Sequence, residues 1–223
     1  MTTTRTMRAV QLAALLTLMT LLLTSCNTAS NTAGGDAAVP GSAMQYAPDP
    51  HATHSSPDVT TASEFSIYDL EAEWQDQQAL TLRLSDLAGR PRVIALVYTS
   101  CAYACPRILK DMKRIEGDLR AAGIDAGYVM VTIDPERDTP QRLRDYAVST
   151  MLDPNDWTLL TGTKDGTLEL AALLGVRYRR VSETDFEHSN VITLLDADGR
   201  IVQRQVGLNS DPVELVRAAT SLP

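Results

Sequence analysis

The stretch YTSCAYACP, Tyr98–Pro106, decides how this sequence is interpreted. It places Cys101 and Cys105 four positions apart, directly after RVIALVY (92–98), which is a nearly continuous apolar and β-branched run. Such a run is typical of a central strand that is covered on both faces. After the cysteines, apolar residues recur at helical spacing over 108–119, so a helix follows. The cysteine pair is therefore expected where a buried strand ends and a helix begins.

The order of elements around this junction predicts an α/β, thioredoxin-like fold. Apolar runs predict two further strands, and apolar periodicity with capping and stop residues predicts two further helices. The strands are expected at 127–133 and 158–162, and the helices over 138–151 and 164–174. Parallel strands joined through helices in this way build the first half of such a fold.

The two ends of the domain complete the sheet. The stretch NVITLLDADGRIVQRQVG (190–207) predicts two antiparallel strands joined by the hairpin signal DADG, and a closing helix opens at 211–212. Before the central strand, FSIYDL (65–70) and LTLRL (80–84) are expected to be short strands. We therefore predict a mixed central sheet flanked by helices, with an N-terminal strand extension.

The first 26 residues predict export and lipidation. Arg5 and Arg8 form a basic start, and Ala9–Leu23 is an uncharged apolar run too short to span a bilayer comfortably. The ending LTSC resembles a bacterial lipobox, which makes Cys26 the expected lipidated residue. We predict a lipoprotein signal peptide over 1–25 and an extracytoplasmic protein, periplasmic or at the cell surface, lipid-anchored to a bacterial membrane. An ordinary signal peptide or an uncleaved anchor is the alternative.

Composition bounds the remainder of the chain. Residues 26–59 are rich in small and polar residues and predict a flexible tether, whereas 60–223 is long enough for one domain with a core. The net charge of −8 becomes −10 when the signal peptide leaves, because it takes two arginines and no acidic residue. An acidic surface argues against nucleic acid as a partner.

The cysteine pair has three possible uses. A structural disulfide is disfavoured, because so small a loop removes little entropy from the unfolded chain. Thiol–disulfide exchange stays open, although three residues separate Cys101 from Cys105 where redox thioredoxins have two. Metal binding is the third use. With Pro106 at the first helical position, Cys105 would precede a helix whose positive end favours thiolate, the form that binds soft metals.

His188 is the candidate third ligand. It is the only histidine of the expected domain and lies just before the strand that starts the hairpin, at the end of the sheet where the cysteines are expected. Two sulfurs and one imidazole suit low-coordinate Cu(I), whereas a structural zinc site needs a fourth ligand.

The segment DPERDTP, Asp134–Pro140, has two interpretations. Its carboxylates could lie near the cysteines. Alternatively, Asp134 pairs with Arg137 and Asp138 caps the following helix, which is the interpretation that we favour.

Taken together, these motifs resemble the Sco/SenC family of copper-handling proteins. The likeness covers about 65–221 and rests on YTSCAYACP, on VTIDPERDTP (131–140) and on FEHSNVITLLDADGR (186–200). In that family a C-x-x-x-C-P loop follows a central strand and a histidine precedes the hairpin, so Cys101, Cys105 and His188 match the copper ligands. The chain departs from the family in AYA between the cysteines and in Glu187 before the histidine.

The resemblance implies a tethered metallochaperone rather than an enzyme. Its cargo would be copper, as Cu(I) and also as Cu(II), delivered for assembly of the dinuclear copper centre of a respiratory haem–copper oxidase. Its partner would be the copper-centre subunit of that oxidase or another extracytoplasmic cuproprotein. The alternative is a thiol–disulfide oxidoreductase, with Cys101 and Cys105 as a redox-active pair that keeps cysteines of an exported target reduced. A copper-sensing module without transfer is a third class.

Overall fold

The structure is a computed structural model that describes residues 65–223. The predicted signal peptide, the tether and the lipidation site Cys26 lie outside the described residues and remain predictions. Among the residues from 65 onward, none of the helices is long and apolar enough to cross a membrane.

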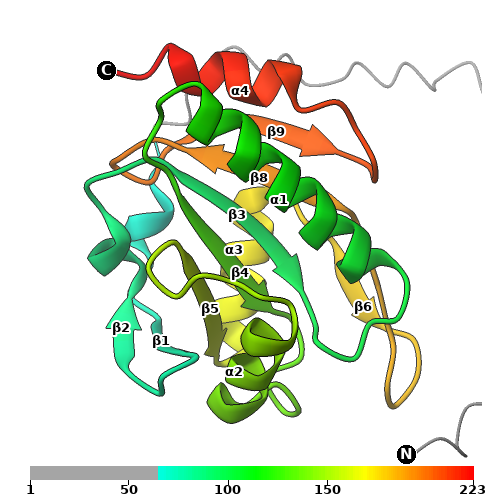
Figure 1. Cartoon of the computed structure of the whole chain (residues 1–223). Helices are drawn as coiled ribbons and strands as arrows, with labels where there is room; N and C mark the ends of the chain where they lie inside the picture. The colour runs from blue at the N-terminus through cyan, green and yellow to red at the C-terminus, as the bar shows by residue number, and fades with distance from the viewer. Residues whose placement is uncertain (1–64) are drawn as a thin grey trace, which may run out of the picture. The chain divides into compact units, whose positions relative to one another are not determined.

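A seven-stranded mixed sheet forms the centre of the described domain (Figure 1). Its strand order is β2-β1-β5-β4-β3-β8-β9. The three parallel strands are β3 (Arg92–Val97), β4 (Gly127–Thr132) and β5 (Trp157–Gly162). The antiparallel strands are β1 (Glu73–Asp76), β2 (Thr81–Arg83), β8 (Val191–Leu195) and β9 (Ile201–Val206). Every residue of β3, β4 and β8 is buried, as expected for strands covered on both faces.

Four helices cover the two faces of the sheet. They are α1 (Ala104–Ala121), α2 (Pro140–Ser149), α3 (Lys164–Leu174) and α4 (Val213–Thr220). In Figure 1, α1 passes in front of the sheet beside α4, and α3 lies behind it. Thr163 caps α3 through the amide of Gly166, and Gly175 ends it with a φ of 72°, a conformation that glycine adopts without strain. The predicted mixed sheet with flanking helices is confirmed.

The N-terminal extension is confirmed as a sheet edge, with one correction in its composition. LTLRL contains β2, but FSIYDL is not a strand: it forms the 3₁₀ helix η1 (Ile67–Asp69). A capping box closes this turn, because the Ser66 hydroxyl accepts from the Tyr68 amide while Asp69 accepts from the Ser66 amide. The strand next to β5 is instead β1, which the sequence analysis did not predict. A second 3₁₀ helix, η2 (Leu84–Leu87), follows β2.

A small hairpin stands apart from the main sheet. Strands β6 (Tyr178–Arg180) and β7 (Phe186–His188) pair with each other in a two-stranded sheet of their own. His188 ends β7, three residues before β8, close to the place predicted for it just before that strand. The short strands β6 and β7 themselves were not predicted.

The junction between β3 and α1 has the predicted position, but the helix begins earlier than expected. The helix α1 starts at Ala104, so Pro106 is its third residue and Cys105 lies inside its first turn. Proline is tolerated there because the first amides of a helix have no partner within the helix. The apolar residues expected on its inner face, from Ile108 to Leu119, are buried as predicted.

Candidate metal centre

Backbone amides surround the two sulfur atoms at this junction. The Cys105 amide donates to Cys101 Sγ at 3.3 Å, and the Tyr98 amide donates to Cys105 Sγ at 3.4 Å. Cys105 is 1% exposed, whereas Cys101 is half-buried; both are free thiols. Amides that donate to sulfur favour the thiolate form over the thiol.

The pair shares its charge unequally. The Cys105 thiol donates to Cys101, and this bond lowers the pKa of Cys101 to about 4, although burial opposes the shift. The same bond raises the pKa of Cys105, and burial raises it further. At neutral pH the pair therefore holds one thiolate, on the more accessible sulfur, and one proton. A metal ion that binds both sulfurs displaces that proton.

The structure brings His188 to the cysteines. Its Nε2 lies 3.8 Å from Cys105 Sγ, and its Nδ1 lies 3.2 Å from the Ser189 carbonyl oxygen. A proton on Nδ1 satisfies that carbonyl and leaves the Nε2 lone pair facing the sulfurs. The three candidate ligand atoms all lie within 4.8 Å of one another. Two ligand atoms that share one ion at about 2.0–2.3 Å lie at most about 4.6 Å apart, so the three atoms are close to the spacing that one shared ion requires.

Tyr98 follows directly after β3 and begins the loop 98–103 that contains Cys101. It links the two sulfurs to the β6–β7 hairpin, which carries His188. Its hydroxyl donates to the Phe186 carbonyl at 3.4 Å and accepts from the Phe186 amide at 3.3 Å. Its ring meets the rings of Phe186 and His188 edge-on, with centroids 5.3 and 6.0 Å away. Tyr98 was not predicted as part of the site. A tyrosine that ends a buried strand is the available signal, because its hydroxyl must find a partner.

Comparison with known protein families shows which family this domain and its motifs belong to. The model of the family described as SCO1/SenC matches residues 62–221. The chain belongs to the SCO1/SenC family. The resemblance predicted from the three motifs is confirmed.

Relatives in this family are similar over most of the domain. A SCO2-like protein of Rickettsia conorii is 30% identical over 173 residues, which is 72% of this chain and 82% of the relative. The structure of Bradyrhizobium japonicum ScoI with copper bound is 28% identical, with a TM-score of 0.55, and the match covers 68% of this chain and 97% of that one. A SCO1/SenC family lipoprotein of Bacillus anthracis has a TM-score of 0.64 at 20% identity, covers 73% and 99% of the two chains, and shows the fold alone. The predicted thioredoxin-like fold is confirmed.

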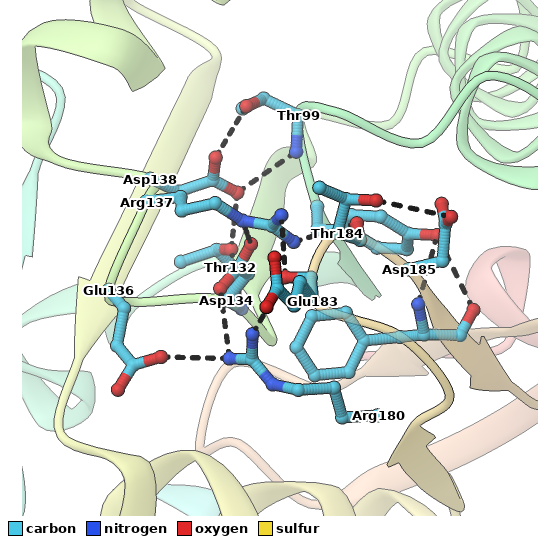
Figure 2. A network of polar contacts seen from close by, with 12 residues as sticks. Thr99, Thr132, Asp134, Glu136, Arg137, Asp138, Arg180, Glu183, Thr184 and Asp185 are labelled. Carbon is cyan, nitrogen blue, oxygen red and sulfur yellow. Dashed lines mark hydrogen bonds and ion pairs between the residues drawn. The ribbon is translucent and has the colours of Figure 1, made fainter.

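Within this SCO1/SenC domain, the DPERDTP segment needs one correction. The predicted ion pair of Asp134 and Arg137 is confirmed, but Asp138 does not cap α2, because Thr139 does. The Asp138 carboxylate points inward and is 0% exposed. It accepts the Thr99 amide at 2.9 Å, the Thr99 hydroxyl, and the Thr132 hydroxyl at 2.5 Å (Figure 2). A carboxylate thus does hold the cysteine loop, as the other interpretation of this segment allowed.

The departures from the family pattern lie at the rim of the site. Glu187 pairs with Arg179 across the hairpin, at 2.5 Å, and not with the imidazole of His188. In AYA, the Tyr103 side chain is exposed, and the guanidinium of Arg107 stacks on it with 3.8 Å to the ring centroid. Neither residue contacts the sulfur atoms through its side chain in the described contacts.

Proposed function

We propose that this protein binds one copper ion through Cys101, Cys105 and His188 and passes it to another protein outside the cytoplasm. The observation that carries the proposal is the convergence of two sulfurs and one imidazole nitrogen within 4.8 Å, from three separate elements of the chain. Membership of the SCO1/SenC family supports the choice of metal, as does the similarity to Bradyrhizobium japonicum ScoI, whose structure has copper bound.

The donor set fits Cu(I) better than other metals. Thiolates are soft ligands that select Cu(I), and imidazole is a usual copper ligand. A structural zinc site is closed by four protein ligands, and the cluster found among residues 65–223 has three. The same residues hold Cu(II) as a second state of the cargo.

The burial of the three ligands sets the order in which they release the copper. Cys101 and His188 are half-buried, whereas Cys105 is almost fully enclosed. An incoming thiolate of an acceptor therefore reaches the copper from the side of Cys101 and His188. These two ligands are replaced first, and Cys105 is the last ligand to dissociate from the copper. Thiolates pass the ion through shared-sulfur intermediates, and the tighter site of the acceptor drives the transfer.

The acceptor and the anchor complete the proposal. The resemblance of the motifs to the family supports delivery to the copper-centre subunit of a haem–copper oxidase, or to another extracytoplasmic cuproprotein. Lipid on Cys26, the first residue after the expected signal peptide, holds the protein to a bacterial membrane next to such an acceptor. Release of a labelled lipid on base treatment, absent in Cys26→Ser, tests this anchor. A Cys26→Ser protein that keeps the label overturns it.

The copper site is tested by replacing each sulfur in turn. The parent is the reduced full chain with Cys26→Ser, in detergent, so that a third thiol does not compete. We expect Cys101→Ser and Cys105→Ser each to abolish tight Cu(I) binding in competition with a chelator, because one thiolate and one imidazole make a poor copper site. Tight binding retained by either variant contradicts the two-thiolate site.

One observation favours thiol–disulfide exchange as a second function. Cys101 is a half-buried thiolate at neutral pH, and Cys105 is a buried partner that can resolve a mixed disulfide. In this function Cys101 attacks a disulfide of the target, and Cys105 then displaces the reduced target and leaves a Cys101–Cys105 disulfide. His188→Ala separates the two functions, since only copper binding uses the imidazole as a ligand. We expect it to weaken copper binding and to spare formation of the disulfide.

A further inference from the structure

The strand that carries His188 does not pair with the main sheet. Strands β6 and β7 form their own two-stranded sheet, so no ladder of backbone hydrogen bonds joins the hairpin to β8 or to β3. A two-stranded hairpin alone is at best marginally stable in water. Side chains of the domain must therefore hold this hairpin where its imidazole meets the sulfurs.

A buried carboxylate lies beside the hairpin. Asp134 is 0% exposed, and its Oδ2 accepts from Arg137 Nε. Its Oδ1 accepts no hydrogen bond from the described residues and lies 3.5 Å from Arg180 Nη2. Arg180 is the last residue of β6 and also pairs with Glu136 at 2.8 Å (Figure 2). One buried charge thus holds two guanidinium groups, one from its own segment and one from the hairpin.

Both arginines contact the β6–β7 hairpin. Arg137 Nη1 donates to the Glu183 carbonyl at 3.0 Å, and its Nη2 donates to the Thr184 carbonyl at 2.7 Å, so it binds the turn between β6 and β7. The Arg180 guanidinium lies over the Phe186 ring, 4.8 Å from its centroid. A planar guanidinium that is fixed by a carboxylate at one edge can present its other donors to two carbonyls at once.

The same segment also holds the cysteine loop. Asp138, four residues after Asp134, accepts both the amide and the hydroxyl of Thr99, which is two residues before Cys101. The segment 134–138 therefore contacts both parts of the copper site. Asp138 holds the loop that contains Cys101, whereas Asp134 and Arg137 hold the β6–β7 hairpin.

We propose that Asp134, Arg137 and Arg180 are positioning residues that form a clamp, and that this clamp sets His188 over the two sulfurs. The inference rests on the proposed copper site. Without the clamp the hairpin keeps the contacts of Tyr98, the packing of Tyr178 and Phe186 against the core, and its own base, and the imidazole reaches the copper for a smaller fraction of the time. The clamp thus sets the share of affinity that His188 supplies, although none of its residues contacts the metal.

The test replaces Arg137 by lysine, with Arg90→Lys as the matched control. Lysine keeps the positive charge beside Asp134, but its single nitrogen does not span the carboxylate and the two carbonyls that three separate nitrogens of Arg137 reach. Arg90 is similarly exposed, 25% against 28% for the Arg137 side chain, and likewise joins a carboxylate, that of Asp125, to a backbone carbonyl. Arg90 precedes β3, at the opposite end of the strand from the cysteines.

Cu(I) affinity is measured by chelator competition on the full chain carrying Cys26→Ser. We expect Arg137→Lys to weaken binding about tenfold, the lower end of the effect of outer contacts on metal affinity, and Arg90→Lys to leave it unchanged. X-ray absorption of the Cu(I) protein should show a reduced nitrogen shell in Arg137→Lys only. In a His188→Ala background, Arg137→Lys should change the affinity by less than about twofold, because its effect passes through the imidazole.

A metal-free measurement separates this inference from the proposed function. Hydrogen exchange of the apoprotein should be faster at the hairpin amides of Val181 and Ser189 in Arg137→Lys, and unchanged in Arg90→Lys. Equal exchange and equal affinity in Arg137→Lys and parent overturn the clamp. A parent whose affinity is indifferent to His188 overturns the histidine ligand instead, and exchange then decides the clamp. Should Arg137→Lys fail to fold, Arg180→Lys carries the same expectations.

Discussion

Replacing Asp138 by asparagine tests whether a buried carboxylate anchors the cysteine loop. The carboxylate accepts three hydrogen bonds, from the amide and hydroxyl of Thr99 and from the hydroxyl of Thr132, in a site with no exposure to solvent. Hydrogen bonds to a charged group contribute about 1.5–3 kcal/mol each and neutral ones about 0.5–1.5. Asparagine keeps the shape but removes the charge and replaces one accepting oxygen by an amino group that only donates, so the bonds lose about 1 kcal/mol each and the variant about 3 kcal/mol of unfolding free energy.

The assay is thermal unfolding of the reduced, metal-free protein followed by circular dichroism. A loss of about 3 kcal/mol corresponds to a fall in Tm of roughly 6–12 °C, because 1 kcal/mol moves Tm by about 2–4 °C in a chain of this size. Asp145→Asn is the matched control, since Asp145 lies on α2, which begins two residues after Asp138, and accepts one exposed bond from Gln141. It should change stability by less than about 0.5 kcal/mol. An Asp138→Asn protein with the Tm of the control would refute the anchor.

Three further predictions concern single side chains. Tyr98→Phe keeps the aromatic contacts but removes both hydrogen bonds of the hydroxyl to β7, and should lower the unfolding free energy by about 1–2 kcal/mol in urea titration; an unchanged midpoint contradicts the link. The rate at which iodoacetamide alkylates Cys101, read by mass spectrometry, should be nearly independent of pH from 8 to 6. It should fall as pH drops through about 4, because protonation removes the thiolate. A midpoint near the ordinary cysteine pKa of about 8.5 contradicts the shared proton. Gly162→Ala should destabilise the protein by about 1–3 kcal/mol, because the added Cβ would lie 2.5 Å from Trp74 Cε3. Gly117→Ala, in open space on α1, should instead stabilise it by up to about 1 kcal/mol. Equal melting temperatures of these two variants contradict the packing of Gly162 against Trp74.

The parts of the fold that the sequence predicts are those that local pattern decides. The strand β3 is a continuous apolar run and α1 repeats its apolar residues at helical spacing, so each was predicted within a few residues of its bounds. FSIYDL was misjudged, because a short stretch with aromatic and β-branched residues is typical of a strand. The hydrogen bonds of Ser66 and Asp69 close a tight turn there instead. The hairpin β6–β7 was missed, because strands of three residues have no periodicity to detect.

The site shows the same division. The cysteines and His188 were predicted because a strand–helix junction and a motif mark their places along the chain. The roles of Tyr98 and Asp138 were not, because they depend on contacts between distant segments: Asp138 holds a threonine 39 positions earlier, and Tyr98 holds a strand 88 positions later. Sequence spacing alone does not show whether an aspartate before a helix turns outward to cap it or inward to hold a loop.

The proposed copper site consists of the thiolates of Cys101 and Cys105 and the imidazole of His188. It is tested most directly by anaerobic Cu(I) titration of the reduced protein carrying Cys26→Ser, beside the same protein with His188→Ala. We expect tight binding of one Cu(I) per chain, and at least tenfold weaker binding without the imidazole. Weak binding by the parent, or equal affinity in both proteins, would contradict it and leave Cys101 and Cys105 as a redox pair.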